Sequence, residues 1–115
     1  MTFFIGSSII DEKRITNRLR LKVLWLNKGL GFAIDFIVLH KTYPLTSYYF
    51  WPQSQAWEQL KFELDCKPGI TEVQRIKILN LVSEIMSVWK TSKNRTISET
   101  LLNQFSDVTF VKLKN

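Results

Sequence analysis

Residues 18–27, RLRLKVLWLN, constrain the fold of this 115-residue chain more than any other stretch. Their side chains alternate between two faces, as they do along an extended strand. One face would carry Leu19, Leu21, Val23 and Trp25, and the other would carry Arg20, Lys22, Leu24 and Leu26. A second alternating stretch, residues 32–39, follows a turn at residues 27–31 that contains two glycines free to adopt positive φ. The two stretches therefore predict a β-hairpin.

Residues 40–69 predict a loop, a short strand and a helix. Residues 40–47, HKTYPLTS, are typical of a loop, since Pro44 pushes the preceding residue toward extended geometry and breaks a helix. Residues 47–50 favour a short third strand, because Tyr and Phe suit a pleated surface. Pro52 suits the first turn of a helix that residues 67–69, KPG, would end. The apolar stripe of that helix would consist of Ala56, Trp57, Leu60 and Leu64.

A second helix is predicted from Thr71 to about Lys90, because Thr71 and Gln74 have the spacing of a capping box. Its apolar face would contain Ile78, Leu81, Val82, Ile85, Met86 and Trp89. A polar linker follows at residues 91–96. Residues 98–105 then predict a short helix, and residues 108–113 a terminal strand or an extended tail.

Strands that precede helices indicate the α+β class. We expect a small antiparallel sheet, made of the hairpin and a short third strand, packed against two helices. The composition, 45% hydrophobic and 23% charged, is that of a globular chain. The expected organisation is an irregular N-terminal arm at residues 1–17, a single α+β domain at residues 18–90 and a C-terminal tail at residues 91–115.

The positive charge is concentrated in two parts of the chain. The net charge is +6 overall, and it divides into +4 for residues 1–52, zero for residues 53–90 and +2 for residues 91–115. This distribution is expected of a phosphate-binding face beside a neutral packing region, although ordinary solubility charge is the alternative. The candidate RNA-binding residues are Lys13, Arg14, Arg18, Arg20, Lys22, Lys28, Lys41, Lys93, Arg95, Lys112 and Lys114.

Aromatic residues gather in residues 48–57, YYFWPQSQAW. Tyr48 and Phe50 would share one face of the third strand, and Tyr49 and Trp51 the other. One pair should join the core, and the second would be free to contact RNA or a neighbour. Trp25 falls on the face opposite Arg20 and Lys22, so the hairpin favours contact with RNA shape and backbone over base stacking.

The sequence offers little catalytic chemistry. The single histidine, His40, has no second histidine and no carboxylate at a recognisable spacing. Asp35 is expected to be an exposed strand residue or to pair with a basic residue of the first strand. The single cysteine, Cys66, excludes a disulfide framework or a Cys-based zinc site within the chain. No apolar run approaches the ~20 residues of a membrane helix. We expect no catalytic residue, metal site, cofactor, small-molecule substrate or membrane partner.

Several segments between residues 19 and 89 resemble one protein family in unbroken order. They are LWLNK at 24–28, GFAID at 31–35, PLT at 44–46, YFWP at 49–52, AWE at 56–58, LK at 60–61 and KP at 67–68. This pattern resembles plastid-specific ribosomal protein three of the small subunit, a family also found in cyanobacteria. The chain departs from it at residues 53–55, QSQ, where the family has basic residues followed by an aspartate.

The resemblance implies a non-catalytic, structural component of the chloroplast small ribosomal subunit that supports translation. It also implies binding to small-subunit ribosomal RNA and to neighbouring ribosomal proteins. The alternative is an interaction or assembly factor of a plastid complex that does not bind RNA directly. The first residues have the features of neither a signal peptide nor a transit peptide. Eleven Ile and eleven Lys beside two Ala suggest an A/T-rich genome. We therefore expect a plastid-encoded protein of the chloroplast stroma.

Overall fold

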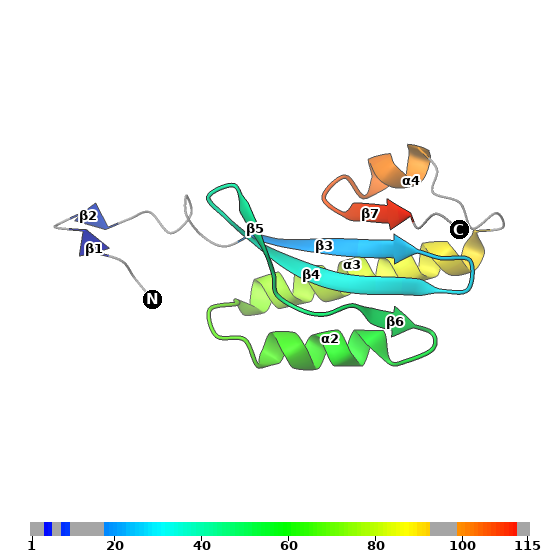
Figure 1. The fold of residues 1–115 in the computed structure, drawn as a ribbon, viewed down its shortest axis with the longest axis horizontal. Coiled ribbons are helices and arrows are strands. Elements are labelled where there is room, and N and C mark those ends of the chain that lie inside the picture. The colour runs from blue at the N-terminus through cyan, green and yellow to red at the C-terminus, as the bar shows by residue number, and fades with distance from the viewer. Residues whose placement is uncertain (1–3, 6–7, 10–17, 93–98, 113–115) are drawn as a thin grey trace.

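The computed structural model describes residues 4–5, 8–9, 18–92 and 99–112. The predicted hairpin forms the centre of its larger sheet, where β3 (Arg18–Trp25) pairs antiparallel with β4 (Leu30–Val38). The described strands of this sheet follow the order β5-β4-β3-β7, and β6 also pairs with β4 (Figure 1). Strands β1 (Phe4–Ile5) and β2 (Ser8–Ile9) pair with each other in the segment predicted as an irregular arm.

Strand β5 (Lys41–Pro44) corrects the prediction that residues 40–47 are all loop. It pairs antiparallel with β4, with Lys41 opposite Val38 and Pro44 opposite Asp35. The connection is a tight turn at Leu39 and His40, whose φ angles are 48° and 70°. Two-residue hairpin turns of type I′ need positive φ at both central positions, and Asn-Gly is their usual signal. Leu39 and His40 give no such signal, which explains why the strand was missed.

Strand β6 (Tyr49–Trp51) is the predicted short third strand, and it pairs antiparallel with β4 from Phe32 to Leu30. The chain then turns at residues 52–55, where Ser54 N donates a hydrogen bond to the carbonyl oxygen of Phe50 (3.0 Å). The next helix, α2 (Ala56–Asp65), begins only after this turn. The prediction that Pro52 lies in the first turn of the helix is therefore wrong.

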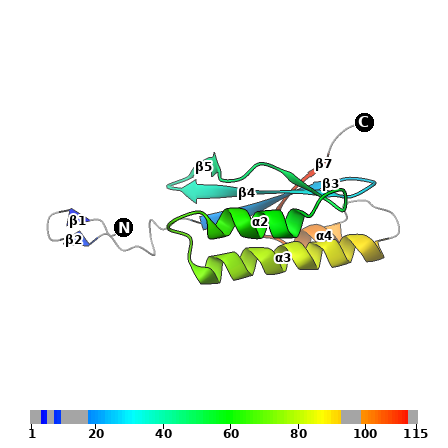
Figure 2. The same ribbon diagram turned by 90° about the horizontal axis from the view of Figure 1, so that it is seen from below.

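Helices α2 and α3 (Glu72–Thr91) lie on the same side of the sheet, which confirms the α+β class (Figure 2). The predicted capping box opens α3: Thr71 Oγ1 accepts a hydrogen bond from Gln74 N (3.1 Å), and Gln74 Oε1 accepts one from Thr71 N (2.9 Å). The predicted stripes are buried in most positions: Ala56, Leu60 and Leu64 on α2 are fully inaccessible, whereas Trp57 on α2 and Leu81 and Met86 on α3 are only partly buried. None of the helices in the described parts of the chain is both long and apolar enough to cross a membrane.

The core lies between the sheet and these helices. It takes alternate residues from β3 and β4, as the hairpin pattern predicts, and continues into the helices. Its largest fully buried side chains are Phe32, Leu21, Leu30, Ile34, Leu60, Leu64, Ile85, Val23 and Val82. Burial of a side chain of this size contributes about 1.5–3 kcal/mol relative to leaving it in water. The side of the sheet that faces the helices is therefore fixed by hydrophobic burial.

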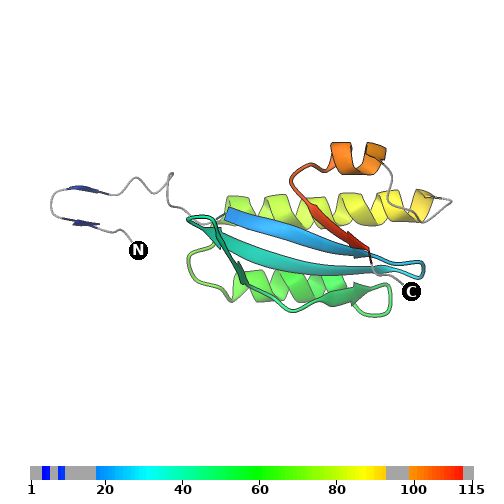
Figure 3. The same ribbon diagram turned by 45° about the horizontal axis from the view of Figure 1, so that its top comes forward.

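The C-terminal residues 99–112 contribute to the same sheet and core. Strand β7 (Thr109–Lys112) pairs in parallel with β3, from Lys22 beside Thr109 to Trp25 beside Lys112. It lies at the end of β3 far from β5 (Figure 3). Helix α4 (Glu99–Gln104) precedes it, and the side chains of Leu101, Phe105 and Val108 are buried. The predicted short helix and the alternative of a terminal strand are both confirmed.

Two glycines of the hairpin are needed for close packing, and neither of them adopts positive φ. Neither Gly29 nor Gly31 has positive φ, contrary to expectation, and Gly69 (φ 85°) is the only described glycine that has. A Cβ at Gly29 would collide with the carbonyl oxygen of Trp51, and one at Gly31 would lie 2.8 Å from Cε1 of Phe50. These glycines let the β6 backbone and the Phe50 ring approach the hairpin.

Candidate nucleic-acid interface

The face of the sheet opposite α2 and α3, called here the open face, carries the basic residues of β3. Val23 and Trp25 point into the core, so the alternation of the strand places Arg18, Arg20 and Lys22 on the open face. Within residues 18–92 and 99–112, no helix lies over this face (Figure 2). The sequence thus brings three predicted RNA-binding residues into one row.

Arg20 and Lys22 are held in this row by neighbouring strands. The Nε of Arg20 donates a hydrogen bond to Oγ1 of Thr109 on β7 (2.7 Å). The Nζ of Lys22 lies 3.3 Å from Oδ2 of Asp35 on β4. Asp35 is only 6% exposed, and a carboxylate buried to this extent requires a partner. The expected pairing of Asp35 with a basic residue of the first strand is confirmed, while the expectation that it is exposed is wrong.

Of the other predicted RNA-binding residues, Lys28 and Lys41 lie away from this row. Lys28 is exposed in the β3–β4 turn, and Lys41 is exposed at the other end of the sheet, where β5 begins. Lys112 ends β7, and its backbone is in register with Trp25. The remaining predicted residues, Lys13, Arg14, Lys93, Arg95 and Lys114, lie outside the described residues.

Two aromatic residues, Tyr48 and Phe50, lie near these cations on the open face, which the sequence did not indicate. The rings of Tyr48 and Phe50 are stacked, with 6.3 Å between centroids and 27° between planes. The Nζ of Lys22 lies 5.5 Å from the Tyr48 centroid, within the range of a cation–π contact. Trp25 does lie on the opposite face, as expected, but Tyr48 places an aromatic ring beside the basic side chains of the open face. The alternation within residues 48–51 separates the two pairs, but no sequence signal sets the register of β6 on β4.

The other aromatic pair of this segment, Tyr49 and Trp51, lies on the helix side, as one pair was expected to do. The hydroxyl of Tyr49 donates a hydrogen bond to Oε1 of Glu63 on α2 (2.7 Å). This bond, together with burial and the negative charge of Glu63, raises the pKa of Tyr49 above its ordinary value. The ring of Trp51 packs edge-on against Trp89, with centroids 5.6 Å apart.

On helices α2 and α3 and the loop between them, several cations are neutralised by acidic neighbours. Lys61 Nζ lies 2.9 Å from Asp65 Oδ2, Lys67 Nζ lies 3.5 Å from Glu63 Oε2, and Arg75 Nε lies 3.4 Å from Asp65 Oδ1. This pairing agrees with the zero net charge of residues 53–90. Among the described residues, no cluster of three or more His, Cys, Asp or Glu side chains could hold a metal ion. The row on the open face, by contrast, contains three cations and one acidic partner, Asp35.

Comparison with known proteins gives a consistent result. Residues 45–92 match the family model described as plastid and cyanobacterial ribosomal protein (PSRP-3/Ycf65). The chain is 47% identical over 89 residues to a probable small ribosomal subunit protein cS23 of Synechococcus sp. strain JA-2-3B'a(2-13), covering 76% of this chain and 89% of that protein. It is 35% identical over 95 residues to small ribosomal subunit protein cS23 of Gracilaria tenuistipitata var. liui, covering 83% and 96%.

A plant relative is longer. The chain is 42% identical over 73 residues to small ribosomal subunit protein cS23y of Arabidopsis thaliana. The matched stretch covers 63% of this chain but only 40% of the plant protein. The family model and the relatives agree with the resemblance seen in residues 19–89. This chain belongs to the plastid and cyanobacterial ribosomal protein family PSRP-3/Ycf65.

Proposed function

We propose that this protein is a structural, non-catalytic component of the plastid small ribosomal subunit and binds ribosomal RNA through its open face. The observation that carries the RNA-binding part is the row of Arg18, Arg20 and Lys22 on a sheet face that no described helix covers. Membership in a ribosomal protein family of plastids and cyanobacteria supports the rest.

Electrostatics supports RNA as the partner of this face. The row contains three cations and, beneath Lys22, one nearly buried carboxylate, Asp35. Arg18 is exposed, so its guanidinium is available to phosphate oxygens. Each phosphate that a protein neutralises releases counterions, which makes RNA affinity fall as the salt concentration rises. Lys28 and Lys41, at opposite ends of the sheet, would extend contact along the RNA backbone.

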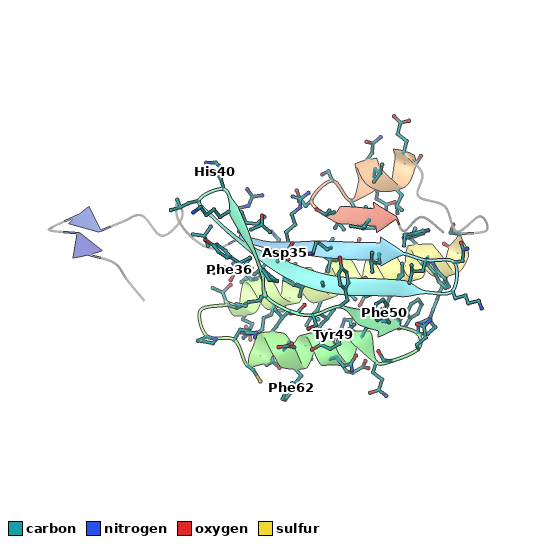
Figure 4. The ribbon with its side chains drawn as sticks, viewed as in Figure 1. Asp35, Phe36, His40, Tyr49, Phe50 and Phe62 are labelled. Atoms are coloured by element: carbon teal, nitrogen blue, oxygen red, sulfur yellow. The ribbon has the colours of Figure 1, made fainter. Side chains whose placement is uncertain are left out.

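The helix layer is the proposed site of contact with neighbouring ribosomal proteins. Phe62 on α2 is 70% exposed and points away from the core (Figure 4). Val73 and Ile76 on α3 are 67% and 51% exposed. Apolar side chains at such positions would lose their contact with water in a protein interface. We further propose that the gene lies in the plastid genome, which the abundance of Ile and Lys over Ala supports.

Sedimentation tests the ribosomal assignment. In a lysate of plastids from the source cell, the protein should sediment with whole ribosomes at high magnesium. At low magnesium, which separates the subunits, it should follow small-subunit ribosomal RNA. Absence from these fractions at both magnesium concentrations would refute the proposal.

RNA binding is tested by removing three exposed cations of the sheet together, with the changes Arg18→Gln, Lys28→Gln and Lys41→Gln. Affinity for a transcript of plastid small-subunit ribosomal RNA should fall, and the slope of log K against log salt should decrease by roughly one per lost phosphate contact. The matched control removes the same charge from the helices with Lys61→Gln, Lys77→Gln and Lys90→Gln. Equal losses in both variants would mean that only net charge matters. Affinity that is independent of salt would favour the alternative of an assembly factor that does not bind RNA.

A further inference from the structure

We propose that Tyr48 and Phe50 form a stacking platform for an unpaired base of RNA, beside the cations of β3. This inference rests on the proposed RNA binding and adds to it a mode of recognition, since phosphate contacts alone do not distinguish single-stranded from paired RNA. Exposed aromatic rings beside basic side chains are what a protein uses to hold unpaired bases, often on the open face of a sheet.

The geometry lays the Phe50 ring close against the sheet. Phe50 is opposite Gly31 in the register of β6 and β4, and Cε1 of its ring lies 2.8 Å from the position that a Cβ on Gly31 would take. The missing side chain at Gly31 therefore lets the ring lie close to the backbone. Phe50 is nevertheless 40% exposed, so part of its ring remains available to a base. Tyr48 stacks beside it and widens the aromatic surface.

The charges around the platform favour a nucleotide. The Nζ of Lys22 lies 3.3 Å from Oδ2 of Asp35 and 5.5 Å from the centroid of the Tyr48 ring, so its ammonium is held at the margin of the platform. Arg20 and Arg18 continue the row along β3 at intervals of about 6.6 Å, the distance between alternate residues of a strand. A base stacked on Phe50 would therefore have cations within reach of the phosphates that follow it.

The size of the apolar surface argues against a protein partner on this face. The large apolar side chains that are exposed among the described residues are Leu39, Tyr43, Phe50, Phe62, Val73, Ile76 and Leu102. Of these, only Phe50 lies on the open face: Leu39 is in a turn, the rest of the set apart from Tyr43 lie on helices, and Tyr43 is in register with Phe36, whose place in the alternation of β4 is on the other face. Phe50, with the partly buried ring of Tyr48 beside it, does not provide the extended apolar core that a stable protein interface buries. One base needs no more than one ring.

The test uses the full chain with Phe50→Leu, which keeps an apolar side chain over Gly31 but removes the aromatic face. Affinity for a short single-stranded oligouridine should fall about tenfold, within the range that one base–aromatic stack contributes. Affinity for an RNA duplex should not change, and Phe50→Tyr should bind the oligouridine as the wild type does. Unchanged oligouridine affinity in Phe50→Leu, or an equal loss on the duplex, would overturn the platform. If Phe50→Leu instead leaves RNA affinity intact but weakens attachment to the subunit, the surface binds protein and the inference is wrong.

A second measurement on the wild-type protein does not depend on any variant folding. Irradiation with an oligonucleotide that carries 5-iodouridine should form crosslinks at Tyr48 or Phe50, identified by peptide mass spectrometry. Crosslinks found only at other residues would contradict the platform. The two proposals fail differently: loss of salt-dependent binding to every RNA would refute RNA binding itself, whereas salt-dependent binding without any contribution of Phe50 would refute only the platform.

Discussion

Replacing Trp89 with alanine is expected to lower the free energy of unfolding by about 3–5 kcal/mol, the usual cost of truncating a buried tryptophan. Trp89 is 8% exposed and joins the end of α3 to the sheet. Its Nε1 donates a hydrogen bond to the carbonyl oxygen of Leu26 (3.0 Å), and its ring packs edge-on against Trp51. The variant would therefore lose the contact between α3, the β3–β4 turn and β6 at once. Urea denaturation, extrapolated to water, measures the loss.

The control for this prediction is Trp89→Phe. Phenylalanine keeps an aromatic ring next to Trp51 but has no donor for the Leu26 carbonyl, so the expected loss is about 1–2 kcal/mol. A Trp89→Ala variant as stable as Trp89→Phe would show that the ring contributes little. The loss expected for Trp89→Ala is a large part of the free energy of unfolding, since whole domains are stable by only about 5–15 kcal/mol.

Replacing Gly29 with alanine is expected to destabilise the protein by about 3 kcal/mol, at the upper end of the cost of forcing a methyl group into a packed site. The new Cβ would meet the carbonyl oxygen of Trp51, which belongs to the backbone of β6 and cannot rotate away. Strand β6 would have to move as a whole, together with Tyr49 and its hydrogen bond to Glu63. The shift in the urea midpoint at unchanged m-value reports this loss.

Gly31→Ala is the matched comparison, because it adds the same methyl group to the same hairpin. There the nearest atoms belong to the ring of Phe50, which is partly exposed and can turn outward. We expect a loss of about 1 kcal/mol, at the lower end of the same range. If Gly29→Ala were no more destabilising than Gly31→Ala, the close approach of β6 to the hairpin would be incorrect.

Much of the fold follows from local patterns in the sequence. The alternation in residues 18–27 correctly separates Val23 and Trp25, which are buried, from Arg20 and Lys22 on the other face. The spacing of Thr71 and Gln74 correctly marks the start of α3, because a capping box involves only neighbouring residues. Strand β5 escaped prediction because its turn is made by Leu39 and His40, residues that rarely adopt positive φ.

The candidate site was predictable only in part. The row formed by Arg18, Arg20 and Lys22 follows from the period of the strand, and the excess of positive charge in residues 1–52 indicated it. A pairing of Asp35 with a basic residue of the first strand was one of the two expected outcomes, and the structure shows that this residue is Lys22. The placement of Tyr48 beside Lys22 was not, because it depends on the register of β6 against β4. Lys28 in the turn and Lys41 after the second strand lie at opposite ends of the sheet, as the predicted hairpin implies.

The sequence by itself therefore determined which residues share a face of the central hairpin and of the two long helices, and which family the chain resembles. Both depend on residues that are close together in the chain, so their spacing can be read directly from the sequence. Only the tertiary structure decided that β7 lies parallel to β3, so that Thr109 reaches Arg20, and that Phe50 lies over Gly31. Strands distant in sequence are paired by the burial that the whole chain achieves, and several registers satisfy the same local alternation. The aromatic and basic side chains of the open face were thus brought together by packing on its opposite side.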